Sequence, residues 1–538
     1  MKINMFLVLI SFAGAAIYVF LTTKKPLHML QDNIYNENNR YLKWIFRNKK
    51  EALVNYNYLS FILLLIAYIF KFKYMNIFLM LIFPLLYLSL KRYNKYMRLK
   101  DQAKRPLVIT KRVKRLIFTY FLIYLIPFMI AVFHNKLAIP MLLIVLLMLS
   151  FNYFTLLLAM LINMPVEKGV FYYYMFKAKA KLKSMSNLKI LAVTGSYGKT
   201  SLKNIIKDVL ATSYNCFATP KSINTLNGSM IQINNNLTKY EDVFISEMGA
   251  YVRGEIKGLC KLIRPKYGAI TTIGLAHLET FGSEENIQKA KFELIESLPS
   301  DGLAVLNMDD EKQRTYKLRN KVRIKWVSTQ NKDADLYASN IKYSKDGITF
   351  NVKFKESKET VSFETKLLGS HNIYNILEAL AFAEEFDVPF TKMQQAVKKL
   401  RPTEHRLEIR EFKDFTQIDD AFNSNPVGAK NALKVLSFMD GYKVVVTPGM
   451  IELGEKEDEL NKEFGKEMAG AADLVILVGE KKTKVIKEGL LEEGFSEDNI
   501  IVINNVRDSF PILSELKKEL NKNIIALYEN DLPDSYNE

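Results

Sequence analysis

Cysteine is scarce in this sequence: Cys216 and Cys260 are the only two among 538 residues. Two cysteines cannot build the disulfide framework of a small secreted domain, and neither has a partner at the short spacing typical of metal-binding cysteines. Internal repeats and low-complexity tracts are also absent from the sequence. We therefore expect both cysteines to be small core residues in a reducing compartment.

Acidic residues are nearly missing from the first 165 residues, which hold 22 Lys and Arg but only four Asp and Glu. This difference accounts for the whole formal net charge of +18, because the remaining 53 basic and 53 acidic residues balance. The basic character of the chain therefore does not indicate nucleic-acid binding, and its cause has to lie in the first third.

Long apolar runs fill that first third. Crossing a bilayer core takes roughly 20 helical residues, and four stretches are long enough or nearly so. They are Met5–Thr22, Tyr58–Phe70, Leu116–Phe133 and Leu137–Met164, and a shorter fifth stretch is Met75–Leu90. We predict a membrane region over residues 1–165 with about five transmembrane helices.

Basic residues gather in two of the segments between these runs. Residues 23–56 carry seven Lys and Arg and residues 91–115 carry eleven, whereas 71–74 and 134–136 carry three together. By the positive-inside rule the two basic segments face the cytoplasm. The sequence thus predicts a multi-pass protein of the plasma membrane with everything after Pro165 in the cytoplasm. A cleaved signal peptide is disfavoured, because no small-x-small site is followed by a soluble domain.

After Leu188 the pattern changes to short apolar runs that alternate with amphipathic helices, which is typical of α/β domains with a mainly parallel sheet. An antiparallel hairpin with a turn at Asp346-Gly347 interrupts it between Ala334 and Leu368. We predict a central domain over residues 166–403 and a smaller Rossmann-like α/β domain over 404–538. The predicted strands are Leu188–Val193, Val243–Ser246, Ala269–Ile273, Leu303–Leu306, Gln417–Asp420, Lys443–Val446, Leu474–Val478, Ile500–Ile503 and Ile524–Leu527.

A glycine loop follows the first of these strands: Thr194-Gly195-Ser196-Tyr197-Gly198-Lys199-Thr200-Ser201. Strand, glycine loop, Lys-Thr and helix is the context of a phosphate site, since backbone N–H groups and the helix N-terminus attract phosphate oxygens. Lys199 would reach the terminal phosphates and Thr200 would hold Mg²⁺. Only two residues separate the glycines, whereas the general P-loop pattern has four.

The loop resembles the ATP loop of the Mur ligases, the amide-forming enzymes of cell-wall peptide assembly, and most closely their D-alanyl-D-alanine-adding branch. Further matches follow in the family's order over about residues 190–455. They are Ser246–Ala250, Gly254–Ile256, Ile273–Glu279, Lys289–Glu293, Asn307–Asp310, Gly369–Asn372 with Asn375, His405–Glu408, Asp419–Pro426 and Met450–Gly454.

The resemblance implies the roles of particular residues. ATP would be bound by Gly195, Ser196, Gly198, Lys199, Thr200, Ser201, His371, Asn372, Asn375, Arg406 and Asp420. Lys199, Glu247, His277 and Lys291 would be catalytic, and Thr200, Glu247, His277 and Lys291 would hold Mg²⁺. In the family the lysine that matches Lys291 is carbamylated, which turns a cation into a metal-binding anion. Asn423, Asn425 and Pro426 would shape the hinge and the amine side.

The expected function is an ATP-dependent carboxylate–amine ligase that acts through an acyl phosphate, on a cell-wall peptide precursor. Its expected partners are a UDP- or lipid-linked carboxylate acceptor and an amine such as a D-amino-acid dipeptide, with no nucleic acid. Two departures from the family bear on the substrates. Membrane spans stand where ordinary members have a UDP-binding domain, and Leu527–Asp534 is acidic where the branch has a Lys-Gly-Ser-Arg-like stretch.

Other functions stay open on the sequence. A membrane-bound poly-γ-glutamate-type synthase shares the nucleotide fold and a membrane anchor, although the Glu-Met-Gly-Ala and Asp419–Pro426 stretches fit it less well. A transport protein driven by a P-loop domain would need polar residues along a path through its spans, and these spans are nearly free of ionisable side chains. A ligase-like regulator without activity is disfavoured by the intact Lys199, Glu247, His277 and Lys291.

Overall fold

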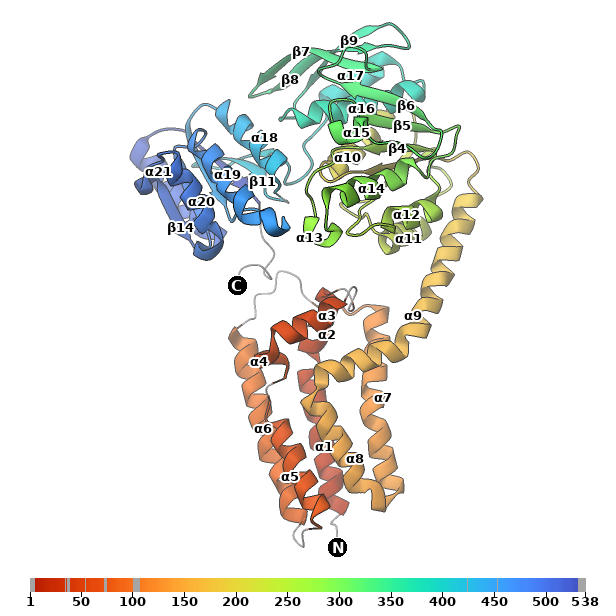
Figure 1. Ribbon diagram of the computed structural model, residues 1–538, viewed down its shortest axis with the longest axis vertical. Helices are drawn as coiled ribbons and strands as arrows, with labels where there is room; N and C mark the ends of the chain where they lie inside the picture. Colours follow the sequence, from red (N-terminus) through yellow and green to blue (C-terminus); the bar gives the residue numbers. More distant parts are fainter. Residues whose placement is uncertain are drawn as a thin grey trace. The chain divides into compact units, whose positions relative to one another are not determined.

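The computed structural model describes residues 5–530 except 34, 36–38, 54, 72–74, 100–106, 423 and 452. The chain divides into two compact units, Met1–Tyr173 and Tyr174–Glu538 (Figure 1). Asn423 of the predicted hinge and residues 531–534 of the acidic C-terminal stretch fall outside the described residues.

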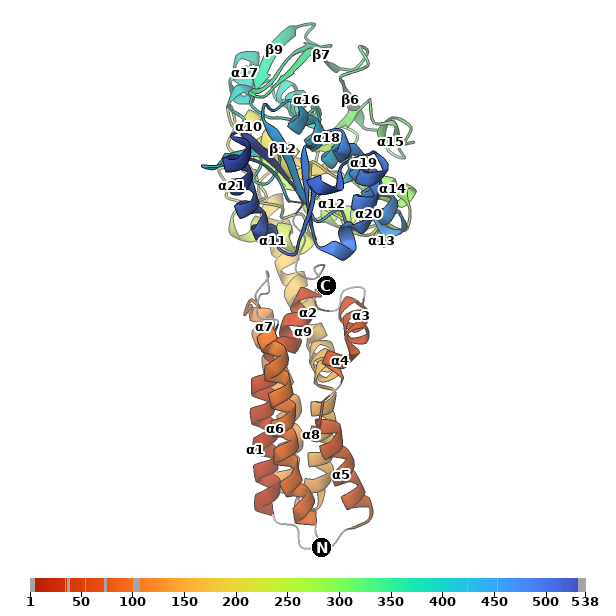
Figure 2. The same ribbon diagram turned by 90° about the vertical axis from the view of Figure 1, so that its left-hand side faces the viewer.

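The first unit is helical. Its core lies between long helices that run side by side, with α1 against α6 and α8, and α5 against the same two helices (Figure 2). Leu64, Leu79, Leu142 and Leu146 are buried at the centre of this core. The helices are α1 (Met5–Thr22), α2 (Lys24–Asp32), α3 (Arg40–Arg47), α4 (Lys49–Ala52), α5 (Asn57–Ile69), α6 (Met75–Leu99), α7 (Lys111–Phe133), η2 (Asn135–Leu137), α8 (Ala138–Ser150) and α9 (Asn152–Lys183), which continues into the second unit.

Four helices within the described residues are long and apolar enough to cross a membrane. They lie over Met5–Thr22, Asn76–Asn94, Lys111–Phe133 and Asn152–Lys183, and each overlaps one of the predicted apolar stretches. The predicted span Tyr58–Phe70 corresponds to α5, which has only 13 residues.

The predicted apolar stretch Leu137–Met164 is not one continuous helix. The helix is interrupted at Phe151, where φ is −117° and ψ is 41°. Hydroxyl groups on both sides bond to the backbone, from Ser150 Oγ to the Leu146 carbonyl at 2.9 Å and from Thr155 Oγ1 to the Met148 carbonyl at 3.0 Å. Such side-chain bonds give the carbonyls an alternative to regular helix, and they mark the break between α8 and α9.

A nine-stranded sheet forms the centre of the second unit, in the order β2-β3-β1-β4-β5-β6-β7-β8-β9. Its strands are parallel from β2 to β7, and β8 and β9 add an antiparallel edge, so the sheet is mixed. The strands are β1 (Lys189–Thr194), β2 (Cys216–Ala218), β3 (Val243–Glu247), β4 (Tyr267–Ile270), β5 (Leu303–Asn307), β6 (Arg323–Ser328), β7 (Leu336–Ser344), β8 (Gly347–Phe354) and β9 (Thr360–Thr365).

Helices cover both faces of this sheet, because successive side chains of a strand point to opposite faces. Ala269 belongs to the core beneath α10 and α16, whereas a side chain at Gly268 would meet Leu294 and Leu298 beside α14. The helices are α10 (Lys199–Leu210), α11 (Leu226–Asn235), α12 (Glu255–Ile263), α13 (Leu278–Phe281), α14 (Glu284–Ile295), α15 (Glu311–Arg314), α16 (His371–Glu385) and α17 (Phe390–Lys399).

The rest of the unit is built on a six-stranded sheet in the order β10-β11-β15-β12-β13-β14, parallel except for the β10–β11 pair. Val445 packs toward α18–α20, and its neighbours Val444 and Val446 pack toward α21. The elements are β10 (Glu408–Glu411), β11 (Thr416–Asp420), α18 (Pro426–Ser437), β12 (Tyr442–Thr447), η3 (Gly454–Lys456), α19 (Glu457–Ala469), β13 (Leu474–Val478), α20 (Glu480–Glu492), η4 (Glu497–Asn499), β14 (Ile500–Ile503), η5 (Val506–Asp508), α21 (Ser509–Leu520) and β15 (Ile524–Glu529).

The predicted strands and the hairpin of β7 and β8 are all present. Strands β2, β6, β9 and β10 were not predicted. Strand β2 has three residues, and β6 carries Arg323 and Lys325, so neither gives a clear apolar pattern.

Candidate active site

The glycine loop lies at the carboxyl end of β1, between the parallel neighbours β3 and β4. Gly195 has φ +148° and Gly198 has φ +79°, conformations that favour glycine. A Cβ on Gly195 would lie 1.9 Å from Thr271 Oγ1. The residues after β4 support the loop, since the Ser196 N–H donates to the Thr272 carbonyl at 2.7 Å and Ser196 Oγ donates to the Gly274 carbonyl at 2.9 Å.

Lys199 begins α10 and turns back into the loop. Its Nζ donates to the carbonyls of Gly195 and Ser196, both at 2.9 Å. Burial lowers the pKa of Lys199 to about 8, with a smaller contribution from the charge of Arg406, while Glu247 opposes the shift. The loop therefore holds the Lys199 amine against two of its own carbonyls.

Thr200 and Glu247 meet beside the loop. Glu247 ends β3 opposite Val193 of β1, and its Oε2 accepts a hydrogen bond from Thr200 Oγ1 at 2.9 Å. A hydroxyl and a carboxylate placed together fit Mg²⁺, which prefers hard oxygen ligands and usually keeps several waters.

The other two predicted metal ligands belong to other elements of the fold. His277, at the start of α13, has φ +57° and its ring centroid lies 4.4 Å from that of Tyr251. Lys291 of α14 is 2% exposed, and burial, helped by the charge of Lys199, lowers its pKa to about 7. Within the described residues no three His, Cys, Asp or Glu side chains gather at metal-binding distance.

The predicted nucleotide residues of α16 lie against the loop. Helix α16 packs on α10, and a Cβ on Gly198 would lie 3.5 Å from Asn375 Oδ1. Asn375 Nδ2 donates to Asn372 Oδ1 at 3.2 Å, and Asn372 Nδ2 donates to the Leu368 carbonyl at 2.7 Å. Burial, with the charge of Arg406, lowers the pKa of His371 to about 4, so its imidazole is neutral at pH 7.

Arg406 and Asp420 lie together at the start of the C-terminal sheet. Asp420 accepts a hydrogen bond from the Leu407 N–H at 3.2 Å, and burial raises the pKa of Asp420 to about 6 against the opposing charge of Arg406. The Arg406 guanidinium carbon lies 4.7 Å from the ring centroid of Phe422. Glu529 is paired with Asp420 in the sheet register and is 1% exposed. Burial, and then the charge of Asp420, raises the pKa of Glu529 well above its usual range.

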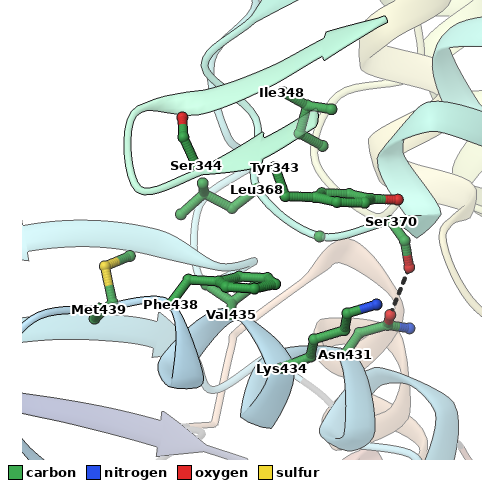
Figure 3. Close-up of a pocket in the computed structure, with 11 residues that line it drawn as sticks. Tyr343, Ser344, Ile348, Leu368, Ser370, Asn431, Lys434, Val435, Phe438 and Met439 are labelled. Carbon is green, nitrogen blue, oxygen red and sulfur yellow. Dashed lines mark hydrogen bonds between the residues drawn. The ribbon is translucent and has the colours of Figure 1, made fainter. Parts of the chain in front are cut away.

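Contacts next to α16 join the central sheet to the C-terminal part. Ser370, the residue before α16, donates from Oγ to Asn431 Oδ1 of α18 at 2.7 Å (Figure 3). The rings of Tyr343 and Phe438 stack nearby with an interplanar angle of 6° and centroids 6.3 Å apart. These side chains line a small pocket, so the position of α18 is coupled to the turn that carries His371.

Sequence reasoning missed Lys203, Asn224 and Glu529. Lys203 forms a buried ion pair with Glu247, and Asn224 Nδ2 donates to Glu247 Oε1 at 3.1 Å. The sequence does contain a signal for Lys203, because this lysine lies on the apolar side of α10, three residues before Ile206. Glu529 was noted only as part of an acidic stretch, whereas the structure buries it in β15.

The family model described as "Mur ligase middle domain" matches residues 193–383, and "Mur ligase, glutamate ligase domain" matches 405–521. A UDP-N-acetylmuramoyl-tripeptide–D-alanyl-D-alanine ligase of Bacillus subtilis is 30% identical over 357 residues, 65% of this chain and 75% of the relative. The chain belongs to the Mur ligase family. Both the family and the enzyme class predicted from the sequence are thus confirmed, because Mur ligases are ATP-dependent amide ligases.

Solved structures agree on the fold of this Mur ligase. MurF from Acinetobacter baumannii superposes with a TM-score of 0.60 at 22% identity, over 68% of this chain and 78% of that one. MurF from Thermotoga maritima in complex with ADP gives a TM-score of 0.59 at 24% identity, over 68% of this chain and 81% of that one. Residues 1–192 precede both family models.

The substitution G195A is expected to weaken ADP binding by about 10- to 100-fold, because relieving the clash with Thr271 strains the loop. ADP affinity of the full-length protein in detergent measures this effect. The matched control is G258A, which lies in α12 with no atom within 4 Å of the added Cβ. Equal ADP affinity in G195A and G258A would contradict the role of the loop.

His371 is expected to make stability depend on pH. The pKa of His371 is about 4 in the folded protein, whereas the usual value for histidine is 6.5. Between these two pH values the unfolded chain therefore binds a proton at His371 that the folded protein does not. Stability is therefore lost as pH falls through this window, by about 2 kcal/mol between pH 7.5 and pH 5. Denaturant unfolding at both pH values should show this loss in the wild type and in the control H134Q, which removes an exposed histidine, and a smaller loss in H371Q. The same loss of stability in the wild type, H134Q and H371Q would refute the assignment of this pH dependence to His371.

Proposed function

We propose that this Mur ligase joins the carboxylate of a cell-wall peptide precursor to an amine of the D-alanyl-D-alanine type. The curated relative of Bacillus subtilis is named for that reaction. The observation that carries the proposal is the meeting of Thr200 with Glu247 at 2.9 Å beside the Lys199 loop. This arrangement serves phosphoryl transfer from ATP, the step that an amide ligase needs first.

The reaction has two balanced steps. A carboxylate oxygen of the acceptor attacks the γ-phosphorus of ATP, and the bond to the β-phosphate oxygen breaks to give ADP and an acyl phosphate. The amine nitrogen then attacks the acyl carbon, phosphate leaves, and the nitrogen loses a proton. Lys199 and the N–H groups of the loop stabilise the charge on the transferred phosphoryl group.

Thr200 and Glu247 would hold Mg²⁺ through one hydroxyl and one carboxylate oxygen, and a bound Mg²⁺ would neutralise charge on the phosphates. We assign a second metal position to His277 and Lys291. A pKa of about 7 leaves much of Lys291 as the neutral amine at pH 7. The neutral amine is the form that reacts with carbon dioxide to give a carbamate.

The nucleotide would extend from the loop toward α16. In this proposal Gly195, Ser196, Gly198 and Ser201 surround the phosphates. The base and ribose would contact residues of two elements that meet at the start of α16, namely His371, Asn372, Asn375, Arg406 and Asp420. Because Ser370 is bonded to Asn431 of α18, movement of the C-terminal part would also move this turn. Closure would exclude water, which otherwise hydrolyses an acyl phosphate.

We further propose a membrane region over residues 1–165, a central ATP-binding domain over 166–403 and a C-terminal domain over 404–538. Four helices of sufficient length and apolarity support the membrane region. So do exposed apolar side chains on these helices, among them Phe6, Phe20, Phe118 and Phe133. The basic segments 23–56 and 91–115 favour a multi-pass protein of the plasma membrane with cytoplasmic catalytic domains. A lipid-linked acceptor is then the alternative to a UDP-linked one.

Purified full-length protein with ATP, Mg²⁺, a muramyl peptide and D-alanyl-D-alanine is expected to release phosphate only when both substrates are present. The substitution K199A should lower the rate by at least about 100-fold, because it removes a charge that stabilises the transferred phosphoryl group. K207A, on the exposed side of α10, is the matched control. Phosphate release that needs no acceptor would count against a ligase.

Alkaline carbonate treatment is expected to leave the full chain in the membrane fraction, because apolar helices stay inserted when peripheral proteins are released. The ligase activity of the same membranes is then measured with UDP-linked and with lipid-linked muramyl peptides, which compares the two acceptors. Release of the chain into the supernatant would contradict the proposed membrane region. Turnover of UDP-linked peptide alone would remove the lipid-linked alternative.

A further inference from the structure

Lys203 is a second lysine of the phosphate-loop helix, one turn after Lys199, and its side chain is 1% exposed. A buried ammonium is stable only where its charge and its N–H donors find partners. Its Nζ lies 3.2 Å from Glu247 Oε2 and also donates to the carbonyl of Lys221. Because the Glu247 side chain is equally buried, the two charges form an enclosed ion pair.

The two lysines of α10 have different surroundings. Lys199 Nζ bonds to the loop carbonyls of Gly195 and Ser196. Lys203 Nζ instead bonds to Glu247 and to the loop after β2. Residues four apart share one face of a helix, so both amines approach the same edge of the sheet. Lys199 faces the loop, and Lys203 faces the carboxylate.

Glu247 holds the loop Thr219–Asn224 in place together with Lys203. The Glu247 N–H donates to Thr219 Oγ1 at 3.2 Å, and Asn224 Nδ2 donates to Glu247 Oε1 at 3.1 Å. Lys203 bonds to Lys221 in the same loop, so both members of the ion pair form hydrogen bonds with this segment. The carboxylate is thereby fixed with Oε2 toward Thr200 and Oε1 toward Asn224.

We propose that Lys203 is a positioning residue, which balances the charge of Glu247 and holds this carboxylate beside Thr200 before a metal ion binds. The metal site is then preformed, and the loop Thr219–Asn224 is ordered around it. This inference rests on the proposed role of Glu247 in holding Mg²⁺. Without Lys203 the buried carboxylate loses its direct ion-pair partner, and a bound cation becomes the group that replaces the missing charge.

The test compares thermal unfolding of the full-length protein in detergent, with EDTA or with Mg²⁺ and ADP. K203M is expected to lower the transition by about 10 °C in EDTA, because it leaves a buried charge without its partner. When Mg²⁺ and ADP replace EDTA, the difference in transition temperature between K203M and the wild type should fall to half or less of its value in EDTA. The matched control K207M removes an exposed lysine one turn further along α10 and should shift the transition by no more than about 1 °C.

A double-mutant cycle tests whether Lys203 acts through Glu247. The double variant K203M/E247Q removes both charges, so it should be at least as stable in EDTA as K203M alone. Additive losses from K203M and E247Q would overturn the proposal. K203R keeps the charge and should retain most of the stability in EDTA, and a loss as large as that of K203M would also overturn it.

Binding of Mn²⁺, followed by electron paramagnetic resonance in the presence of ADP, separates the role of Lys203 as the partner of Glu247 from the role of Glu247 as a metal ligand. Coupled losses in the cycle together with Mn²⁺ binding that E247Q weakens support both the ion pair and the metal role of Glu247. Coupled losses with Mn²⁺ binding unchanged in E247Q support Lys203 as the partner of Glu247 and overturn the assignment of metal to Glu247. If K203M fails to fold, accumulation of K203M/E247Q supports the proposal and its failure overturns it.

Discussion

Burial of the Glu247 carboxylate is the constraint on which this edge of the central sheet depends. The parallel register of β1 and β3 puts Glu247 opposite Val193, directly beside the glycine loop. A carboxylate removed from water costs several kcal/mol unless charges and donors replace its hydration. Thr200, Lys203 and Asn224 supply them. The helix after the loop and the segment after β2 are therefore fixed by one side chain that neither of them contains.

Several positive side chains influence one another at the same edge. The electrostatic influence of Arg406 reaches Lys199, and that of Lys199 reaches Lys291. Glu247 opposes the shift of Lys199, and Glu255 and Glu293 oppose that of Lys291. Burial is the larger cause of the lowered pKa of Lys199 and Lys291, and the repulsion between cations adds to it in a medium of low dielectric. In the proposed phosphate site, the polyphosphate of ATP would relieve this repulsion.

Much of the architecture follows from local sequence patterns, because apolar runs and glycine positions specify strands and the loop within a few residues. The ion pair of Lys203 with Glu247 joins residues 44 positions apart, and no local pattern contains it. The burial of Glu529 depends in the same way on its register with β11. The break at Phe151 escaped prediction because it has no proline or glycine and depends on hydroxyl bonds to the backbone. Apart from this local break, predictions therefore failed where a side chain is bound by a distant element.

The residues proposed for the ligase reaction are confined to one of the two units of the chain. The acyl-phosphate chemistry engages only the acceptor's carboxylate, the amine and ATP, and the residues placed for it all belong to the second unit. None of these residues identifies the carrier to which the acceptor is attached. Helices take up the first unit, outside both family models. Under the proposed function, a difference in the first unit would therefore bear on the acceptor's carrier and not on the activation of its carboxylate.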